Sequence, residues 1–248
     1  MKFWLLHGAL GMTSDWDDVS AALVAAGHQA IAIDLEQLAL AGGDASLEDA
    51  GKQVNALVDS EASVEEQVLV GYSLGGRIAL HALLADSGGF WDRAVIVSAH
   101  PGLENRQDRK TRFEADSIWQ DRLSDAEVLP AEFWQQWQAQ PVFSSDELIE
   151  VPASLDRDQP RKCDLAAFGT WSLGSQQPLS NRFPEISVPV EWVVGEQDPK
   201  FRLLGERAVY GLRGRDHSLS VAPSCGHRIV RQAPEWLAQR LLSPRHLD

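Results

Sequence analysis

The chain has 248 residues, 44% of them hydrophobic and 23% charged, and a formal net charge of −14 at pH 7. This composition is typical of a globular protein that is long enough to bury a sizeable core. The acidic balance argues against a nucleic-acid or anionic-membrane surface, because such surfaces need clustered lysine and arginine. An anionic ligand would therefore have to be held by a few local arginines.

Targeting and redox signals are sparse. The apolar start at 2–6 is interrupted by His7-Gly8 before it reaches the length of a signal-sequence core, and no apolar run approaches a membrane span. Cys163 and Cys225 form neither a disulfide framework nor a metal-ligand spacing. We therefore expect a cytoplasmic protein without metal or cofactor and without membrane or nucleic-acid partners.

The first 98 residues alternate short apolar strands with helices. Strands are expected at 2–6, 30–33, 68–71 and 94–98, and helices from the N-cap Ser14 to about 27, at 47–59 after the cap Ser46, and from the end of the third strand to about 85. A loop with Gly42-Gly43 is expected before the second helix. This alternation is typical of a parallel sheet with right-handed crossovers.

The pattern changes at residue 99. Helices are expected at about 104–123, 125–138, 144–150 and 163–172, with no comparable strand, and the strand rhythm then returns with strands at 188–194 and 217–222 and helices at 201–211 and 233–242. The sequence thus predicts an α/β fold with a mostly parallel six-stranded sheet. Its core is formed by 1–98 and 188–248, and 99–187 is an inserted helical cap.

The motif Gly71-Tyr72-Ser73-Leu74-Gly75 follows the third strand and precedes a helix. A Gly-x-Ser-x-Gly pattern also arises by chance, but a strand before it and a helix after it are what a nucleophile elbow requires. The turn would expose the hydroxyl of Ser73 at the C-terminal edge of the sheet. The sequence therefore predicts an α/β-hydrolase fold with Ser73 as its reactive serine.

A serine needs a histidine to take its proton and an acid to orient that histidine. In this fold the order is Ser, Asp or Glu, His, each after a core strand, and Ser73, Asp198 and His227 satisfy it. Asp198 is also an ordinary turn residue, and Glu196 is an alternative acid. The oxyanion hole is expected from the backbone amides of Ala9, in the loop that begins at His7, and of Leu74.

Four strings resemble the MenH family, the SHCHC synthases of menaquinone and phylloquinone biosynthesis. They are the elbow through Arg77, Ser98-Ala99-His100-Pro101-Gly102-Leu103, the cap string from Trp137 to Phe143, and Gly195-Glu196-Gln197-Asp198-Pro199-Lys200-Phe201. The resemblance implies a lyase that eliminates pyruvate from an enolpyruvyl-succinyl-cyclohexene carboxylate (SEPHCHC). Ser73, activated by His227, would be the base, and the oxyanion hole would hold the enolate.

The resemblance also implies that arginines bind a small anionic carboxylate substrate, because a guanidinium binds a carboxylate with two hydrogen bonds. The implied substrate-binding residues are Tyr72, Arg77, Arg112, Trp137 and Arg157. Cap arginines are also common as solvated ion-pair partners, Trp137 also fits a cap core, and Arg122 and Arg161 compete with Arg112 and Arg157. Where many relatives carry a second histidine, this chain has Arg228-Ile229-Val230-Arg231.

A rival interpretation remains open at this stage. The same triad supports a serine esterase or thioesterase that works through an acyl-enzyme. We expect a monomer or a weak homodimer, and the sequence does not distinguish menaquinone from phylloquinone as the product of the pathway.

Overall fold

The computed structural model describes residues 1–42, 45–59, 65–87, 89–125, 127–152, 155, 159–212 and 216–243. Six strands form one sheet in the order β2-β1-β3-β4-β5-β6, and each neighbouring pair is parallel. The strands are β1 Lys2–Leu6, β2 Gln29–Ile33, β3 Gln67–Tyr72, β4 Arg93–Val97, β5 Val190–Gly195 and β6 Ser218–Ala222. The predicted α/β class and six strands are confirmed, and the sheet is parallel throughout.

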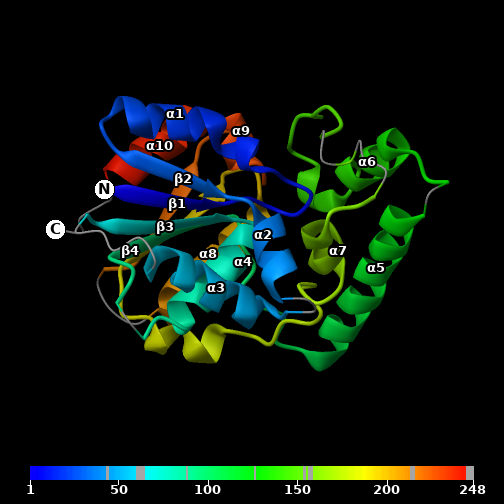
Figure 1. The fold of residues 1–248 in the computed structure, drawn as a ribbon, viewed down its shortest axis with the longest axis horizontal. Helices are drawn as coiled ribbons and strands as arrows, with labels where there is room; N and C mark the ends of the chain where they lie inside the picture. Colours follow the sequence, from blue (N-terminus) through cyan, green and yellow to red (C-terminus); the bar gives the residue numbers. More distant parts are fainter. Residues whose placement is uncertain are drawn as a thin grey trace.

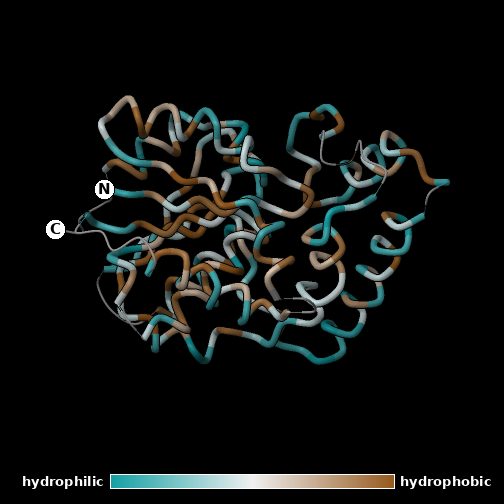
Figure 2. The backbone as a smooth tube through the Cα atoms, in the orientation of Figure 1, coloured by the Kyte–Doolittle hydropathy of each residue, from teal (hydrophilic) through white to brown (hydrophobic). Residues whose placement is uncertain are grey.

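Helices cover both faces of the sheet (Figure 1). One face carries α1 Asp17–Ala25, α9 Ile229–Gln232 and α10 Pro234–Leu242, and the other carries α2 Leu35–Gly42, α3 Leu47–Asp59, α4 Leu74–Leu84 and α8 Pro199–Gly211. Alternate residues of a strand point to opposite faces, so Phe3 and Leu5 pack in the cluster under α1 while Trp4 and Leu6 pack under α4. Figure 2 shows the strands as an apolar centre between more polar helices.

The segment between β4 and β5 lies beyond the C-terminal ends of the strands (Figure 1). Its elements are α5 Arg106–Ser124, α6 Pro130–Gln138, η2 Pro141–Phe143, α7 Lys162–Phe168 and η3 Ser180–Glu185. Phe133, Trp134, Trp137 and Phe168 form a separate apolar cluster with Leu10 of the core. The inserted segment therefore has a small core of its own, over the edge of the sheet where a parallel α/β protein binds its ligands.

Contacts between α2 and α7 attach this segment to the core. Both carboxylate oxygens of Glu36 accept amides at the start of α7, from Lys162 at 3.1 Å and from Cys163 at 2.9 Å. A carboxylate at a helix N-terminus satisfies amides that have no partner within the helix and interacts favourably with the helix dipole. The α2 helix was not predicted, since the sequence interpretation placed a loop at Gly42-Gly43.

Three predicted helix limits also differ from the structure. Ser14 lies inside the short helix η1 Thr13–Trp16, and α1 begins at Asp17. The second cap helix begins at Pro130, because proline favours the first helical position. Residues 144–150 are not helical: the amide and carbonyl of Ile149 bond to the side chains of Gln138 and Trp134. Ser46 caps α3 as expected, with its hydroxyl accepting from the amide of Asp49.

Candidate active site

Ser73 lies at the turn between β3 and α4. Its φ of 53° and ψ of −109° place a non-glycine residue in left-handed backbone, which costs on the order of 1–3 kcal/mol and persists only where neighbouring structure holds it. The amide of Ser73 donates to the Val97 carbonyl at 2.8 Å, and its carbonyl accepts from the Arg77 amide at 3.1 Å. The elbow is therefore fixed on both sides.

Two glycines make this turn possible. A Cβ at Gly71 would contact the carbonyl oxygen of Gly75, and a Cβ at Gly75 would contact the carbonyl oxygen of Leu6 in β1. Neither backbone contact can move without disturbing the sheet or the first turn of α4. The two glycines of the motif are thus required by the close passage of the chain.

The side chains of Ser73, His227 and Asp198 form a continuous chain of hydrogen bonds. His227 Nε2 lies 3.2 Å from Ser73 Oγ, and His227 Nδ1 lies 3.1 Å from Asp198 Oδ2. Both His227 and Asp198 are buried. A histidine that donates from Nδ1 to a carboxylate presents Nε2 as an acceptor for the serine proton, which is the arrangement required to activate a serine.

The structure distinguishes between the two candidate acids. Asp198 caps α8, where its Oδ1 accepts the Phe201 amide at 3.1 Å, and this fixes its Oδ2 toward His227. Glu196 is exposed and accepts instead from the Ser224 amide at 2.8 Å. Asp198, and not Glu196, is the acid beside the histidine.

Three aromatic rings surround His227. The ring of Phe201 lies 4.5 Å from the imidazole centroid, Tyr72 lies at 5.7 Å and Phe143 at 5.8 Å. Tyr72 directly precedes the serine, and burial raises the pKa of its hydroxyl. The sequence interpretation missed Phe143 and Phe201 as neighbours of the histidine, because aromatic residues at those positions carry no chemical signature.

The loop after β1 lies against the elbow. A Cβ on Gly8 would be 2.9 Å from the Tyr72 ring and 3.5 Å from Ser73 Cβ, so Gly8 lies close beside the elbow and Ala9 is the next residue. His7 holds this loop: its Nδ1 bonds the Gly8 carbonyl at 2.8 Å, and its Nε2 accepts the Leu35 amide at 3.2 Å.

Leu74 opens α4, and the first amides of a helix have no acceptor within it. The amides of Ala9 and Leu74 therefore stay our candidates for the oxyanion hole.

Arg77 is buried one turn into α4. Its Nε donates to Gln176 Oε1 at 2.6 Å and its Nη2 to the Trp171 carbonyl at 2.8 Å. Burial, with a smaller contribution from the charge of Arg112, lowers the pKa of Arg77 to about 9, so it remains protonated at neutral pH. The sequence interpretation missed Gln176 as the partner of Arg77.

Arg112 is partly exposed on α5. Its Nε donates to Asp116 Oδ1 at 2.8 Å, and Asp116 Oδ2 accepts from Ser172 Oγ at 2.7 Å. Burial, together with the nearby charges of Lys200, Arg77 and Arg112, lowers the pKa of His100 to about 3. A neutral histidine and several cations thus share one region of the molecule.

The competing arginines have other partners. Arg161 is buried, pairs with Asp34 and donates to the Gly11 carbonyl at 2.8 Å, so it connects the cap to the core. Arg122 lies 3.5 Å from Glu132. Arg157 lies outside the described residues, so its predicted role is not placed.

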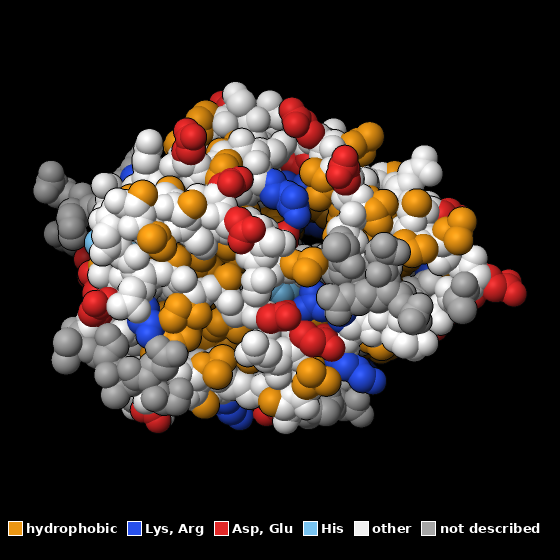
Figure 3. All heavy atoms as spheres, turned by 45° about the horizontal axis from the view of Figure 1, so that its top comes forward, with side chains coloured by type: hydrophobic (Ala, Val, Ile, Leu, Met, Phe, Trp, Pro, Cys, Tyr) orange, Lys and Arg blue, Asp and Glu red, His pale blue; other side chains and the backbone are white. Residues whose placement is uncertain are grey.

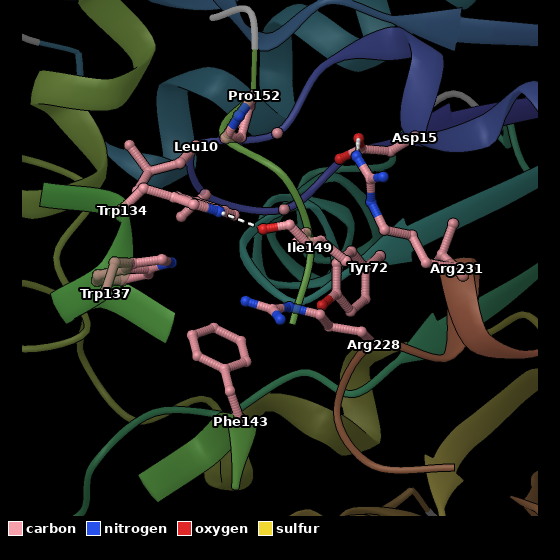
Figure 4. A pocket seen from close by; sticks show the side chains of 14 residues that line it. Leu10, Asp15, Tyr72, Trp134, Trp137, Phe143, Ile149, Pro152, Arg228 and Arg231 are labelled. Carbon is pink, nitrogen blue, oxygen red and sulfur yellow. Dashed lines mark hydrogen bonds and ion pairs between the residues drawn. The ribbon is translucent and has the colours of Figure 1, made fainter. Parts of the chain in front are cut away.

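Trp137 packs edge-on against Trp119 and Phe168, with ring centroids 5.2 Å away in each case. It also lines a pocket beside the elbow, next to the loop that begins at His7 (Figure 4). Trp137 thus belongs to the cap core and also lines a pocket, and its role in substrate binding stays a prediction. The residues lining this pocket are Gly8, Ala9, Leu10, Gly11, Asp15, Tyr72, Trp134, Trp137, Phe143, Ile149, Pro152, Arg228, Val230 and Arg231.

Charged side chains of both signs lie on the face of the molecule drawn in Figure 3. On the face drawn in Figure 3, basic side chains lie at the rim of a hollow in a surface with many acidic groups. Across the residues that the structure describes, no group of three His, Cys, Asp or Glu side chains has the geometry of a metal site. In the same part of the chain, no helix has the length and apolarity needed to cross a membrane.

Comparison with known proteins supports the fold and the family. A model of the alpha/beta hydrolase family matches residues 5–240. A protein of Serratia proteamaculans named 2-succinyl-6-hydroxy-2,4-cyclohexadiene-1-carboxylate synthase is 29% identical, with 96% of this chain and 91% of the relative covered. The Escherichia coli protein of the same name is 32% identical, with 93% and 89% covered.

Among solved structures, MenH from S. aureus superposes with a TM-score of 0.79 at 20% sequence identity, covering 98% of this chain and 92% of that one. At this identity the superposition supports the fold, and the sequence relatives above 30% identity support the narrower family. The chain belongs to the alpha/beta hydrolase family and, within it, to the family of 2-succinyl-6-hydroxy-2,4-cyclohexadiene-1-carboxylate synthases.

Proposed function

We propose that this chain is a carbon–oxygen lyase that eliminates pyruvate from SEPHCHC to give SHCHC, in menaquinone or phylloquinone biosynthesis. The observation that carries the proposal is the hydrogen-bonded Ser73, His227 and Asp198 in a chain 32% identical to a named SHCHC synthase. Buried Arg77 and partly exposed Arg112 supply positive charge for a substrate with several carboxylates.

In the proposed mechanism, Ser73 Oγ takes a proton from the substrate carbon while His227 Nε2 accepts the serine proton and Asp198 stabilises the resulting imidazolium. The electron pair left on carbon passes to the neighbouring oxygen, where the amides of Ala9 and Leu74 hold the enolate. Collapse of the enolate breaks the ether C–O bond and expels the enolate of pyruvate, which takes the proton held on His227 and becomes pyruvate, so that Ser73 and His227 return to their starting states. No water enters this reaction, and no acyl-enzyme forms.

The proposal also assigns the parts of the chain. Residues 1–98 and 188–248 would be the catalytic core and 99–187 an inserted helical cap, and the substrate would be bound by Tyr72, Arg77, Arg112, Trp137 and Arg157. Cys163 and Cys225 are free thiols, which supports a cytoplasmic location. We propose a monomer or weak homodimer.

The test is to incubate the protein with SEPHCHC and follow pyruvate release. We expect turnover by the wild-type chain and a loss of about 10²–10⁴-fold in kcat for Ser73→Ala, because a positioned base contributes that much. Ser117→Ala is the matched control, since this partly exposed serine on α5 bonds the Phe113 carbonyl of its own helix. Hydrolysis of p-nitrophenyl esters with a trapped acyl-serine, and no pyruvate release, would establish the esterase or thioesterase instead.

A further inference from the structure

Arg228 directly follows the histidine of the triad and is buried, with 6% of its surface exposed. Its guanidinium carbon lies 4.0 Å from the centroid of the Phe143 ring and 5.8 Å from that of Trp134. Phe143 also contacts His227. A cation from the core is thus stacked on aromatic rings from the cap, beside the catalytic histidine.

The hydrogen bonds of this guanidinium are incomplete. Nη1 donates to the Glu147 carbonyl at 3.2 Å and to Gln138 Oε1 at 3.4 Å, whereas Nη2 is buried and has no partner among the described residues. Asp146 Oδ2 lies 3.9 Å from Nε, which is beyond hydrogen-bond distance. A buried N–H group of a charged side chain is costly when it is unpaired, because it has lost its hydrogen bonds to water, so the site favours an acceptor.

The orientation of Arg228 is suited to a ligand. Stacking on Phe143 uses the flat face of the guanidinium and leaves its N–H edge free to bond. Figure 4 shows this edge directed between Trp137 and Phe143 into the pocket, with Tyr72 beside it. The backbone of Gly8 and Ala9 forms another part of the same pocket.

The other charged groups that the structure describes near the pocket do not provide an acceptor for Arg228 Nη2. Asp15 and Arg231 both line it, but they pair with each other at 2.6 Å (Figure 4). Asp146 lies against the backbone, where its Oδ1 accepts the Arg228 amide at 3.3 Å, and burial raises the pKa of its carboxyl. Burial also lowers the pKa of Arg228 from its usual value, and an arginine so shifted still carries its charge at neutral pH.

We propose that Arg228 binds a carboxylate group of the substrate through Nη2. The carboxylate would lie in the pocket between the loop at Gly8 and Ala9 and the cap rings of Trp137 and Phe143. The inference rests on the proposed function for the identity of the substrate. Arg77 is not among the residues that line this pocket, so the substrate would be held by cations at two separate places. A carboxylate at Arg228 would also contact a side chain adjacent to the catalytic histidine.

The probe is succinate, a small dicarboxylate that resembles one arm of the substrate. The dissociation constant of succinate is measured by calorimetry for the wild-type protein, for Arg228→Gln and for the control Arg202→Gln, and the KM for SEPHCHC is measured alongside. We expect Arg228→Gln to weaken succinate binding and raise KM by about 10- to 100-fold, as loss of a charge-assisted hydrogen bond predicts. Arg202→Gln should change both by less than about threefold, because this exposed arginine of α8 pairs with Glu206 of its own helix and does not line the pocket.

A structural role for Arg228 would give a different result. It would lower the thermal midpoint and kcat while leaving the succinate affinity unchanged, and that outcome, or equal affinity in wild type and Arg228→Gln for any reason, overturns the proposal. Should Arg228→Gln fail to fold, Arg228→Lys keeps the charge against Phe143 but loses the planar fork, and about threefold weaker succinate binding is expected. Absence of pyruvate release by the wild-type protein would sink the lyase, yet the succinate comparison would still decide the role of Arg228.

Discussion

The two oxygens of Asp198 connect the start of α8 to His227. Oδ1 accepts the Phe201 amide at 3.1 Å, and Oδ2 lies 3.1 Å from His227 Nδ1. The helix cap therefore determines the direction in which the carboxylate faces the imidazole. The Phe201 amide forms the cap hydrogen bond, and the centroid of the Phe201 ring lies 4.5 Å from that of the same imidazole. The segment from Asp198 to Phe201 therefore positions the histidine through both the carboxylate and the ring.

Asp198→Asn should separate these two roles. Asparagine caps a helix about as well as aspartate, so we expect only a small change in thermal midpoint. The orientation and charge that support His227 are lost, however, and kcat for pyruvate release should fall by about 10²–10⁴-fold. Glu196→Gln is the control, and loss of activity in that variant with an active Asp198→Asn would show that the wrong acid has been assigned.

The triad was predictable because its signal is local. The strand, turn and helix around Ser73 each follow from a few neighbouring residues. The order of serine, acid and histidine along the chain then points to Asp198 and His227. The sequence favoured Asp198 and left Glu196 open as an alternative, since the choice depends on the α8 cap and on the Ser224 amide that binds Glu196.

The cap side of the site was less predictable, because its contacts join residues far apart in the chain. Gln176 reaches Arg77 across 99 positions, and Arg228 meets Phe143 and the Glu147 carbonyl across the interface between core and cap. No periodicity in the sequence reports such contacts. The predicted helix at 144–150 was wrong for the same reason, because the backbone of that segment bonds to side chains from elsewhere.

Arg77→Gln tests the proposed carboxylate clamp on α4. If Arg77 binds the substrate, the variant should raise KM by about 10- to 100-fold, as loss of a charge-assisted hydrogen bond predicts. Some loss of stability is also expected, because Gln176 Oε1 and the Trp171 carbonyl lose their donor. Steady-state kinetics on SEPHCHC and thermal unfolding measure the two effects separately.

Arg109→Gln serves as the control for Arg77, because this α5 arginine bonds the carbonyls of Leu103 and Glu104 near the helix start. An unchanged KM in Arg77→Gln would remove Arg77 from substrate binding and leave it a structural role between α4 and the cap.

Gly51→Ala tests the packing of α3 on α4. A Cβ at Gly51 would lie 2.6 Å from the Ala82 amide nitrogen and 2.7 Å from the His81 carbonyl carbon, so the two helices would have to separate. We expect the free energy of unfolding to fall by about 1–3 kcal/mol, the usual cost of overpacking, despite the higher helix propensity of alanine. Urea unfolding measures it, with the neighbouring exposed Lys52→Ala as control, and a more stable Gly51→Ala would contradict the observed contact.

Asp164 should make the protein less stable as pH rises through the mildly acidic range. This carboxyl is 1% exposed, and its Oδ2 is buried without a partner among the described residues. Burial raises its pKa from 3.8 to about 6. The folded state therefore binds the proton more tightly than the unfolded state, and the stability that this group contributes is lost between about pH 4 and pH 6 and stays lost above.

Asp164→Asn should remove this cost. We expect it to raise the free energy of unfolding by about 3 kcal/mol at pH 8, at 1.36 kcal/mol for each pKa unit, and to leave it nearly unchanged at pH 4. Urea unfolding at pH 4, 5, 6 and 8 measures the trend, and Asp121→Asn on the exposed face of α5 corrects for the loss of one negative charge. If the free energies of unfolding of wild type and Asp164→Asn differ by the same amount at every pH, Asp164 has the same pKa in the folded and unfolded chains, which would contradict the prediction.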